Sequence, residues 1–97
     1  MNVSNFILLH PDDNVLICRK PAAKGSAVDL DGVSVVLHED IHVGHKIARC
    51  ALNRGDRVIK YGAPIGSIVT AVAAGDHVHL HNMQSDYIAS HTRKVIS

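Results

Sequence analysis

The segment from Gly75 to Asn82 carries three histidines, His77, His79 and His81, that alternate with apolar residues. In a β-strand alternate side chains share one face, so these three imidazoles would project together. Neutral imidazoles gathered on one surface are suited to metal binding or to proton transfer. The alternative is an ordinary half-buried strand whose solvent-exposed face consists of histidine. The pattern alone leaves both interpretations open.

Spacing limits what these histidines could bind together. Alternate residues on a strand lie about 6.6 Å apart, so two imidazoles can converge on one ion, but all three seldom can. The third would form a hydrogen bond elsewhere or act as an acid or base. A catalytic metal site also needs a third ligand and an open position. Asp76 would face the other side and Asp86 lies beyond the strand, so the missing parts could lie on another polypeptide.

Three further clusters combine turn residues with reactive side chains. In His10–Asn14, proline, aspartate and asparagine favour a turn over a site. Gly44-His45-Lys46 would present a histidine and a cation at the start of a strand. In Lys60–Gly66, two glycines and a proline predict a tight, rigid bend flanked by Lys60 and Tyr61. Lysine and tyrosine can bind a carboxylate or transfer protons, although either could be an ordinary exposed side chain.

The elements that must position these residues are short strands. Apolar runs are brief and turn signals are frequent, which is typical of a mostly β protein. No segment sustains a helical period, although Ser85 to Lys94 could form a short terminal helix. The expected strands are Phe6–Leu9, Val15–Arg19, Val33–His38, Lys46–Ala51, Val58–Tyr61, Ser67–Val72 and His77–His81.

A weak internal repeat, apolar-x-x-Gly-x-x-apolar, occurs four times, around Gly25, Gly44, Gly55 and Gly75. Each glycine would permit a positive φ in a tight turn between an apolar anchor and the next strand. The copies are unevenly spaced, which indicates a folded-over β-meander and not a solenoid. These glycines shape turns and need carry no chemistry.

Composition excludes several classes of protein. A chain of 97 residues is one small domain. Its net charge of +1 and lack of a basic run argue against a nucleic-acid partner. No apolar stretch is long enough to span a membrane, and no signal peptide is visible. Cys18 and Cys50 lie in apolar stretches without metal or redox spacing, so both are expected to be buried and inert, as suits a reducing cytoplasm.

Taken together, four motifs resemble the amino-terminal region of altronate and galactarate dehydratases. They are Asp13-Asn14-Val15, Ile41–Ala48, Val58–Gly66 and Gly75–Asn82. Their order and approximate spacing also match, and they cover the chain roughly from His10 to Asn82. The resemblance implies a compact, mostly β SAF domain with a β-clip fold, with residues 1–97 as a single domain.

One departure from the family concerns length. The dehydratases carry a much larger catalytic region after this domain, whereas this chain ends fifteen residues after Asn82. The family also includes two-subunit lyases, such as sulfolactate sulfo-lyase, whose small subunit resembles this domain. The resemblance therefore implies a small subunit that is inactive alone and pairs with a large, dehydratase-like catalytic subunit. A truncated piece of a longer chain is the alternative.

The chemistry implied by the resemblance is β-elimination, either dehydration or desulfonation, on a sugar acid or related 2-hydroxy acid. A base removes the proton next to the carboxylate while hydroxide or sulfite leaves the neighbouring carbon. The family suggests a divalent metal, Fe²⁺ or Mn²⁺, which the partner subunit could hold for the most part. The expected roles are catalysis for His45, Lys60, Tyr61 and His81, substrate binding for Asn14, Lys46 and Asn82, and metal binding for His77 and His79.

Two other functions stay open. A SAF-type module could bind a carboxylated sugar without catalysis, with the histidine strand and Lys60 recognising the ligand. It could also serve only the assembly of a larger protein. Ligand binding by the isolated domain would favour the first of these, and turnover that survives alanine substitutions along the histidine strand would favour the second.

Overall fold

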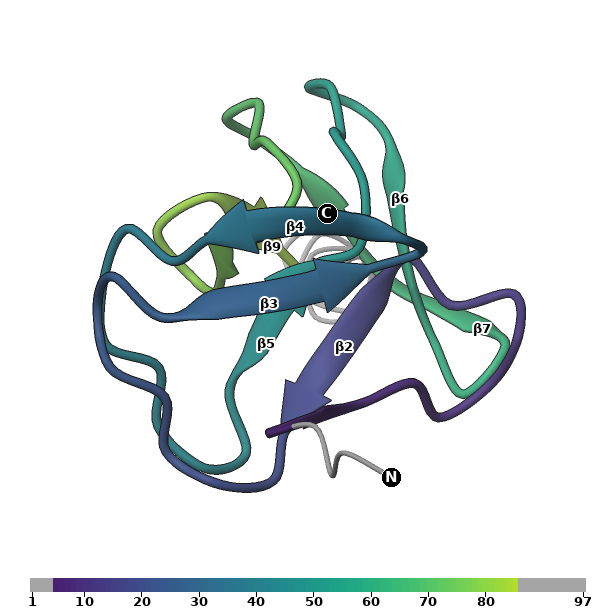
Figure 1. Ribbon diagram of the computed structural model, residues 1–97. Coiled ribbons are helices and arrows are strands. Elements are labelled where there is room, and N and C mark those ends of the chain that lie inside the picture. Colours follow the sequence, from purple (N-terminus) through teal and green to yellow (C-terminus); the bar gives the residue numbers. More distant parts are fainter. Residues whose placement is uncertain (1–4, 86–97) are drawn as a thin grey trace, which may run out of the picture.

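The computed structural model describes residues 5–85, which form short β-strands and no helix (Figure 1). The strands are β1 (Phe6–Ile7), β2 (Val15–Cys18), β3 (Ala27–Leu30), β4 (Val33–Val36), β5 (Lys46–Ala48), β6 (Arg57–Lys60), β7 (Ala63–Ile68), β8 (His77–Val78) and β9 (Met83–Gln84). The mostly β fold predicted from the turn signals is confirmed. The suggested helix from Ser85 to Lys94 lies, apart from its first residue, outside the described residues.

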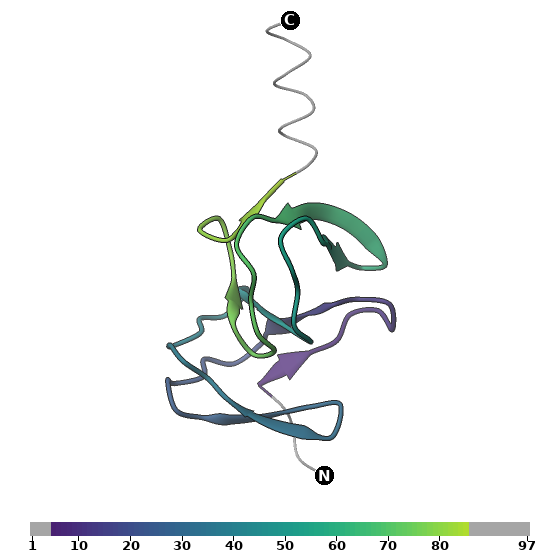
Figure 2. The ribbon, with the colours of Figure 1, turned by 90° about the horizontal axis from the view of Figure 1, so that it is seen from above.

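The strands are arranged around a four-stranded antiparallel sheet in the order β1-β2-β5-β8. Between β2 and β5 the chain leaves this sheet to form the β3–β4 hairpin. Between β5 and β8 it leaves again to form the β6–β7 hairpin, to which β9 adds a third strand. Figure 2 shows the two hairpins at opposite ends of the molecule. The expected meander is therefore wrong, because β5 pairs with β2 and β8 and not with its neighbours in sequence.

The four repeated glycines form the predicted turns. Gly25, Gly44, Gly55 and Gly75 have φ angles between 88° and 93°. In each turn, the residue after the glycine donates its N–H to the carbonyl of the residue two before the glycine, with N···O distances of 2.9–3.1 Å. A positive φ at the third position is that of a type II turn, which glycine adopts without steric cost. The prediction of a positive φ at these glycines is confirmed.

These turns are joined in two pairs. Ala22 and Ile41, which anchor the first two turns, exchange backbone hydrogen bonds of 3.0 and 2.8 Å, and Leu52 and Val72 do the same at 3.0 and 2.9 Å. The chain thus forms one structural unit twice, and each unit has its own apolar core. The first core contains Phe6, Cys18, Ala22, Val28, Leu30, Leu37, Ile41 and Ile47. The second contains Val15, Ala48, Leu52, Val58, Ile68, Val72, Val78 and Met83.

The hairpin turns are also equivalent in the two units. Asp31-Gly32 and Tyr61-Gly62 both have positive φ at their two central residues, as in a type I′ turn. Tyr61 is an unusual residue for this backbone region, since a bulky side chain raises its energy. The buried carboxylate of Asp13 supports it by accepting the N–H groups of Tyr61 and Gly62 at 3.0 and 2.8 Å. The segment His10–Asn14 forms the turn that its residues favoured, closed by a hydrogen bond from the Asp13 N–H to the His10 carbonyl at 3.0 Å. Within it, Asp13 has the structural role of holding the Tyr61-Gly62 turn.

Several predicted boundaries differ from the structure. The bend expected from Lys60 to Gly66 is instead a two-residue turn followed by β7, which begins at Ala63. Hydrogen bonding with β6 continues through this segment, with a register shift between Val58 and Ile59. Strands β3 and β9 were not predicted. Turn residues surround β3 in the sequence, and β9 has only two residues, so neither gives a clear period-two pattern.

The two cysteines differ from each other. Cys18 is buried and its thiol donates to the Lys20 carbonyl at an S···O distance of 2.9 Å. Burial raises the pKa of this thiol. Cys50 is exposed, so the expectation that both are buried is wrong for this residue, which follows β5 at the surface. Among the described residues, no helical segment has the length and apolar character needed to traverse a bilayer.

Gly66 and Gly55 require glycine for two different reasons, a close approach of neighbouring atoms at Gly66 and a positive φ at Gly55. A Cβ on Gly66 would meet the backbone of Gln84 and come within 2.6 Å of the Met83 side chain, whereas one on Gly55 would meet nothing within 4 Å. We expect Gly66→Ala to lower the free energy of unfolding by about 3 kcal/mol through overpacking. Gly55→Ala should cost about 1–2 kcal/mol through its positive φ alone. Urea unfolding of both variants would contradict this account if Gly55→Ala were the more destabilised.

Candidate functional site: a histidine cluster beside two lysines

His45 and His77 come together because β5 pairs with β8. The register places Lys46 opposite Val78 and Ile47 opposite His77, and His45 immediately precedes β5. Ile47 and Val78 are both fully buried, one in each core. If β8 slipped by one residue along β5, His77 would point into an apolar core and Val78 would point toward the surface. Burial of Ile47 and Val78 therefore fixes the register.

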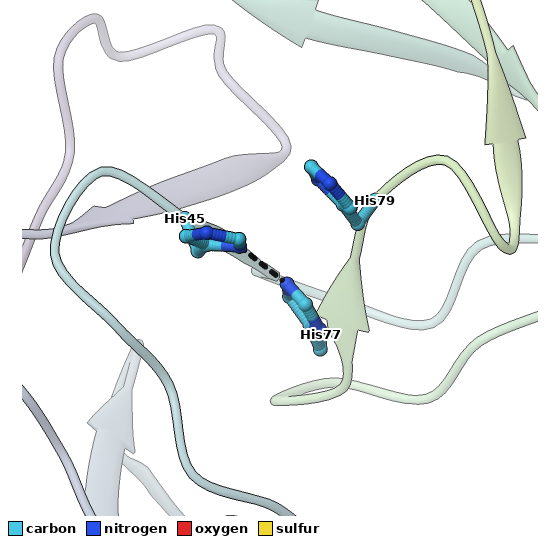
Figure 3. A group of neighbouring side chains, drawn as sticks. All are labelled: His45, His77 and His79. Atoms are coloured by element: carbon cyan, nitrogen blue, oxygen red, sulfur yellow. Dashed lines mark hydrogen bonds between the residues drawn. The ribbon is translucent and has the colours of Figure 1, made fainter.

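The cluster consists of His45, His77 and His79, all half-buried (Figure 3). Nδ1 of His45 lies 3.0 Å from Nε2 of His77. The centroid of the His45 ring lies 5.1 Å from that of His77 and 4.9 Å from that of His79. The rings of His77 and His79 stack with an interplanar angle of 9°. One ring nitrogen from each residue lies within 4.8 Å of the other two.

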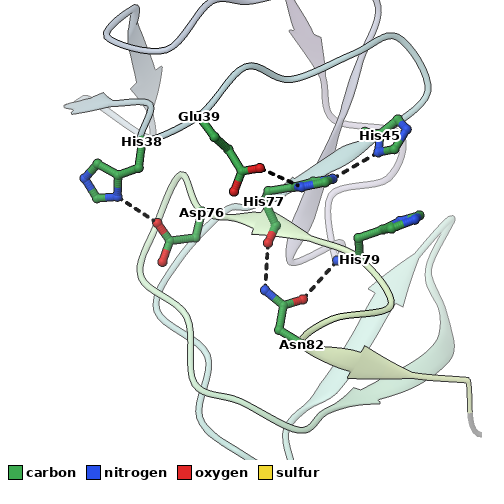
Figure 4. A network of polar contacts seen from close by, with 7 residues as sticks. All are labelled: His38, Glu39, His45, Asp76, His77, His79 and Asn82. Atoms are coloured by element: carbon green, nitrogen blue, oxygen red, sulfur yellow. Dashed lines mark hydrogen bonds and ion pairs between the residues drawn. The ribbon is translucent and has the colours of Figure 1, made fainter.

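The backbone around His79 is held by Asn82. The Asn82 side chain accepts the His79 N–H at 2.9 Å and donates to the His77 carbonyl at 2.8 Å (Figure 4). The predicted strand from His77 to His81 is therefore wrong beyond Val78, where the chain turns instead. Asn82 is only 6% exposed and its amide is occupied by the backbone. Its predicted contact with substrate stays a prediction, and what the structure offers is a role in shaping the loop.

Glu39 is a member of the site that sequence analysis missed. Its Oε1 lies 3.3 Å from Nδ1 of His77, on the side of the ring away from His45 (Figure 4). Glu39, His77 and His81 form a second group whose possible ligand atoms lie within 4.8 Å of one another. Glu39 is 38 residues before His77, and the local pattern around the histidines could not reveal it. Nearby, the Asp76 carboxylate pairs with His38 at 3.2 Å.

The pKa values of two of the imidazoles, His77 and His79, are lowered. Burial lowers the pKa of His77, although the Glu39 carboxylate acts in the opposite direction. Burial also lowers the pKa of His79, and the nearby His45, Lys46 and His81 lower it further. A neutral imidazole is the form that binds a metal or accepts a proton. His77 and His79 thus keep that form to lower pH than an ordinary histidine.

Of the two predicted lysines, Lys46 lies close enough to His79 to lower its pKa, and Lys60 lies close to Lys46. Lys46 is the first residue of β5 and Lys60 the last of β6, and both are half-buried. Burial lowers the pKa of Lys46, and the positive charge of Lys60 lowers it further. Two neighbouring cations that repel each other form an environment in which a carboxylate is favoured. Tyr61, which follows Lys60, is 68% exposed at the hairpin turn.

The side chain of Asn14 is occupied by hydrogen bonds to the backbone of β6. Its side chain donates to the Arg57 carbonyl at 2.7 Å and accepts the Ile59 N–H at 2.8 Å. Both ends of the amide thereby attach the segment before β2 to the backbone of β6. The expected contact between Asn14 and substrate is untested, and these hydrogen bonds would have to break or be shared for it to form.

The donor set of the cluster fits a divalent transition metal. Three half-buried imidazoles from His45, His77 and His79 provide neutral nitrogen ligands within 4.8 Å of one another, and such ligands suit iron and zinc better than manganese. His77 and His79, expected to bind metal, lie in this group together with His45. His81, expected to be catalytic, lies in the second group with Glu39. The metal itself stays a prediction.

Comparison with known proteins agrees with the resemblance noted in the sequence. The chain belongs to the altronate/galactarate dehydratase SAF domain family, whose model matches residues 4–86. It is 37% identical over 84 residues to the altronate dehydratase of Bacillus subtilis (strain 168), a match that covers 87% of this chain. It is 41% identical over 81 residues to the altronate dehydratase of Escherichia coli (strain K12), covering 84% of this chain.

A shorter relative shares part of the same region. The chain is 50% identical over 46 residues to the (2R)-sulfolactate sulfo-lyase subunit alpha of Paracoccus pantotrophus, which covers 47% of this chain and 69% of that subunit. By contrast, the chain spans only 16–17% of the length of the two altronate dehydratases. The similarity therefore establishes a SAF domain related to lyases and covers a small part of those larger enzymes.

The lowered pKa values of His77 and His79 predict how stability depends on pH. Between those values and about 6.5 the unfolded chain binds more protons than the folded one, so the free energy of unfolding rises with pH. We expect this slope to flatten in a His77→Gln/His79→Gln double variant, measured by urea unfolding from pH 5 to 7.5 with a chelator present. Leu80→Gln changes the same loop without removing a titratable group and should retain the slope. An equal slope in the double variant and the parent would contradict this assignment.

Proposed function

We propose that this chain supplies the SAF part of a lyase that performs β-elimination on a sugar acid or related 2-hydroxy acid, and that it works as a small subunit with a large, dehydratase-like catalytic partner. The observation that carries the proposal is the cluster of three half-buried imidazoles beside Lys46, which in turn lies close to Lys60, in a domain of this family. The similarity to a lyase subunit alpha supports a separate partner. The cytoplasmic setting expected from the two cysteines, which lack metal or redox spacing, is part of this proposal.

The reaction requires one proton to leave carbon and a neighbouring bond to break. A base takes the proton next to the carboxylate, a carbon–carbon double bond forms, and the C–O or C–S bond electrons depart with hydroxide or sulfite. The resulting enol rearranges to a 2-keto acid. Because the α-proton is very weakly acidic, the negative charge that develops on the carboxylate must be stabilised strongly.

This chain's residues can take part in defined ways. His45, His77 and His79 would hold a divalent metal, for which Fe²⁺ is favoured over Mn²⁺ by three imidazole ligands. A metal bound there would stabilise the charge developing on the substrate carboxylate. His45 would then be a ligand and not the acid or base expected from the sequence. Lys46 and Lys60 would hold the carboxylate, whose negative charge relieves their mutual repulsion.

Proton transfer is assigned to His81. It is exposed, its ring centroid lies 5.4 Å from that of His77, and it is outside the group of three imidazoles. An imidazole can protonate a departing hydroxyl near neutral pH. The base that removes the α-proton is assigned to the partner.

The proposal predicts that the purified chain alone is inactive and that turnover appears when a large dehydratase-like subunit is added. Altronate, galactarate and (2R)-sulfolactate are the substrates to test, with formation of the 2-keto acid or release of sulfite as the readout. In the reconstituted enzyme, His81→Ala should lower kcat by about 10²-fold, the range expected for loss of a general acid. Rapid elimination by the chain alone would contradict the two-subunit proposal.

Lys60→Met tests carboxylate binding. The substitution keeps most of the aliphatic stem and removes the charge, so thermal stability should change little. Loss of a charged hydrogen bond of about 1.5–3 kcal/mol should raise KM by about 10- to 100-fold. Lys20→Met, which removes an exposed lysine elsewhere on the surface, is the matched control. If Lys60→Met retains the parent KM, Lys60 is a solvated cation without a role in the site.

A binding module without catalysis is the second candidate. The neighbouring Lys46 and Lys60 favour it, because a bound carboxylate would relieve the repulsion between their charges. Calorimetric titration of the isolated chain with galactarate separates the two functions. Strong binding without the large subunit supports a binding module, and binding only in the reconstituted enzyme supports the subunit.

A further inference from the structure

The His77 ring lies between two different partners. Its Nδ1 is 3.3 Å from Oε1 of Glu39, and its Nε2 is 3.0 Å from Nδ1 of His45 (Figure 4). A neutral imidazole carries one proton, so only one of its two nitrogens can donate. The partner that cannot donate therefore determines where this proton lies.

Glu39 is that partner. An ionised carboxylate only accepts hydrogen bonds, and the Glu39 side chain is 55% exposed to solvent. The proton of neutral His77 should consequently lie on Nδ1, where it is donated to Glu39. Nε2 is then left with a lone pair that faces His45, and His45 can donate its own Nδ1–H to it in the absence of a cation.

Both groups of possible ligands depend on His77. One also contains His45, which faces Nε2 of His77, and His79; the other also contains Glu39, which faces Nδ1, and His81. A cation held between Glu39 and His77 would need the lone pair on Nδ1, the nitrogen that faces Glu39, and this would force the proton onto Nε2. A neutral His77 can therefore serve one group at a time.

We propose that Glu39 is a positioning residue that holds the proton of His77 on Nδ1, presents Nε2 to a cation bound with His45 and His79, and thereby limits the cluster to one tightly bound cation. This inference rests on the metal role given to the cluster in the proposed function. A carboxylate that accepts the far N–H of a metal-binding histidine fixes the orientation of the ring and raises its basicity. Burial favours the same group, because His45 and His79 are half-buried whereas Glu39 and His81 are exposed.

Zinc titration of the full chain by calorimetry tests the proposal without any enzyme assay. The parent should bind one Zn²⁺ in its tightest class of sites. Glu39→Ala should weaken this binding by about 10- to 100-fold, the usual effect of losing such a carboxylate. Glu39→Gln, whose amide oxygen can still accept the Nδ1–H, should bind within about threefold of the parent.

Two controls separate this role from general effects of charge and histidine content. Asp12→Asn removes an exposed carboxylate that lies 3.9 Å from another histidine, His10, and should leave zinc affinity unchanged. His81→Ala should also leave it unchanged, whereas His79→Ala should abolish the tight site. The tautomer of His77 can be read directly from the ¹⁵N shifts of its ring in the metal-free chain. It should be the Nδ1–H form in the parent and in Glu39→Gln, and should lose this preference in Glu39→Ala.

Three results would overturn the proposal: two tight zinc ions per chain, a loss in His81→Ala as large as that in His79→Ala, or a His77 tautomer that does not respond to Glu39→Ala. The ¹⁵N shifts of Glu39→Gln and the His81→Ala titration decide the question even if Glu39→Ala folds poorly. Failure of the proposed function is distinguishable, because an absence of lyase turnover in the reconstituted enzyme would leave these zinc and tautomer results in place.

Discussion

The antiparallel pairing of β5 with β8 is the constraint on which the site depends. It places Ile47 opposite His77 and Lys46 opposite Val78. Ile47 belongs to one apolar core and Val78 to the other, so the two cores lock this register from opposite faces of the same pair of strands. Because Lys46 is paired with Val78 and His77 with Ile47, the same register also fixes the positions of these two half-buried polar residues. The apolar residues Ile47 and Val78, which have no reactive groups, therefore position the reactive side chains of the site.

This arrangement follows from a duplication in the structure. The chain runs from β2 through one hairpin to β5, and from β5 through a second hairpin to β8, with matching glycine turns in both units. β5 lies between β2 and β8 and so joins the units. His45 comes from the first unit and His77 and His79 from the second. The residues after the matching glycines are His45 in one unit and Asp76 in the other, so the cluster arises from differences between the copies.

Sequence reasoning succeeded where the determining interaction is local. A glycine with positive φ in a tight turn leaves a short, recognisable pattern, and four such patterns gave the turns and the β class. It failed where contact depends on topology. Glu39 reaches His77 only because the β3–β4 hairpin returns the chain beside β8, and no local pattern records this. The strand expected through His81 was wrong because Asn82 bonds the backbone of His77 and His79, which turns the chain after Val78.

The balance of charge in the site indicates what it can accept. The pKa values of His77 and His79 are lowered, in His79 partly by the positive charge of Lys46, and Lys60 in turn lowers the pKa of Lys46. Glu39 is the only glutamate in the chain, and it faces Nδ1 of His77 and not the lysines. A divalent cation bound by the three imidazoles would carry two positive charges, and the single carboxylate of Glu39 beside His77 would leave part of that charge without neutralisation. An anionic ligand that spans the cation and the lysines would supply that neutralisation, and a 2-hydroxy acid, with its carboxylate and adjacent hydroxyl, has the donor groups to do so.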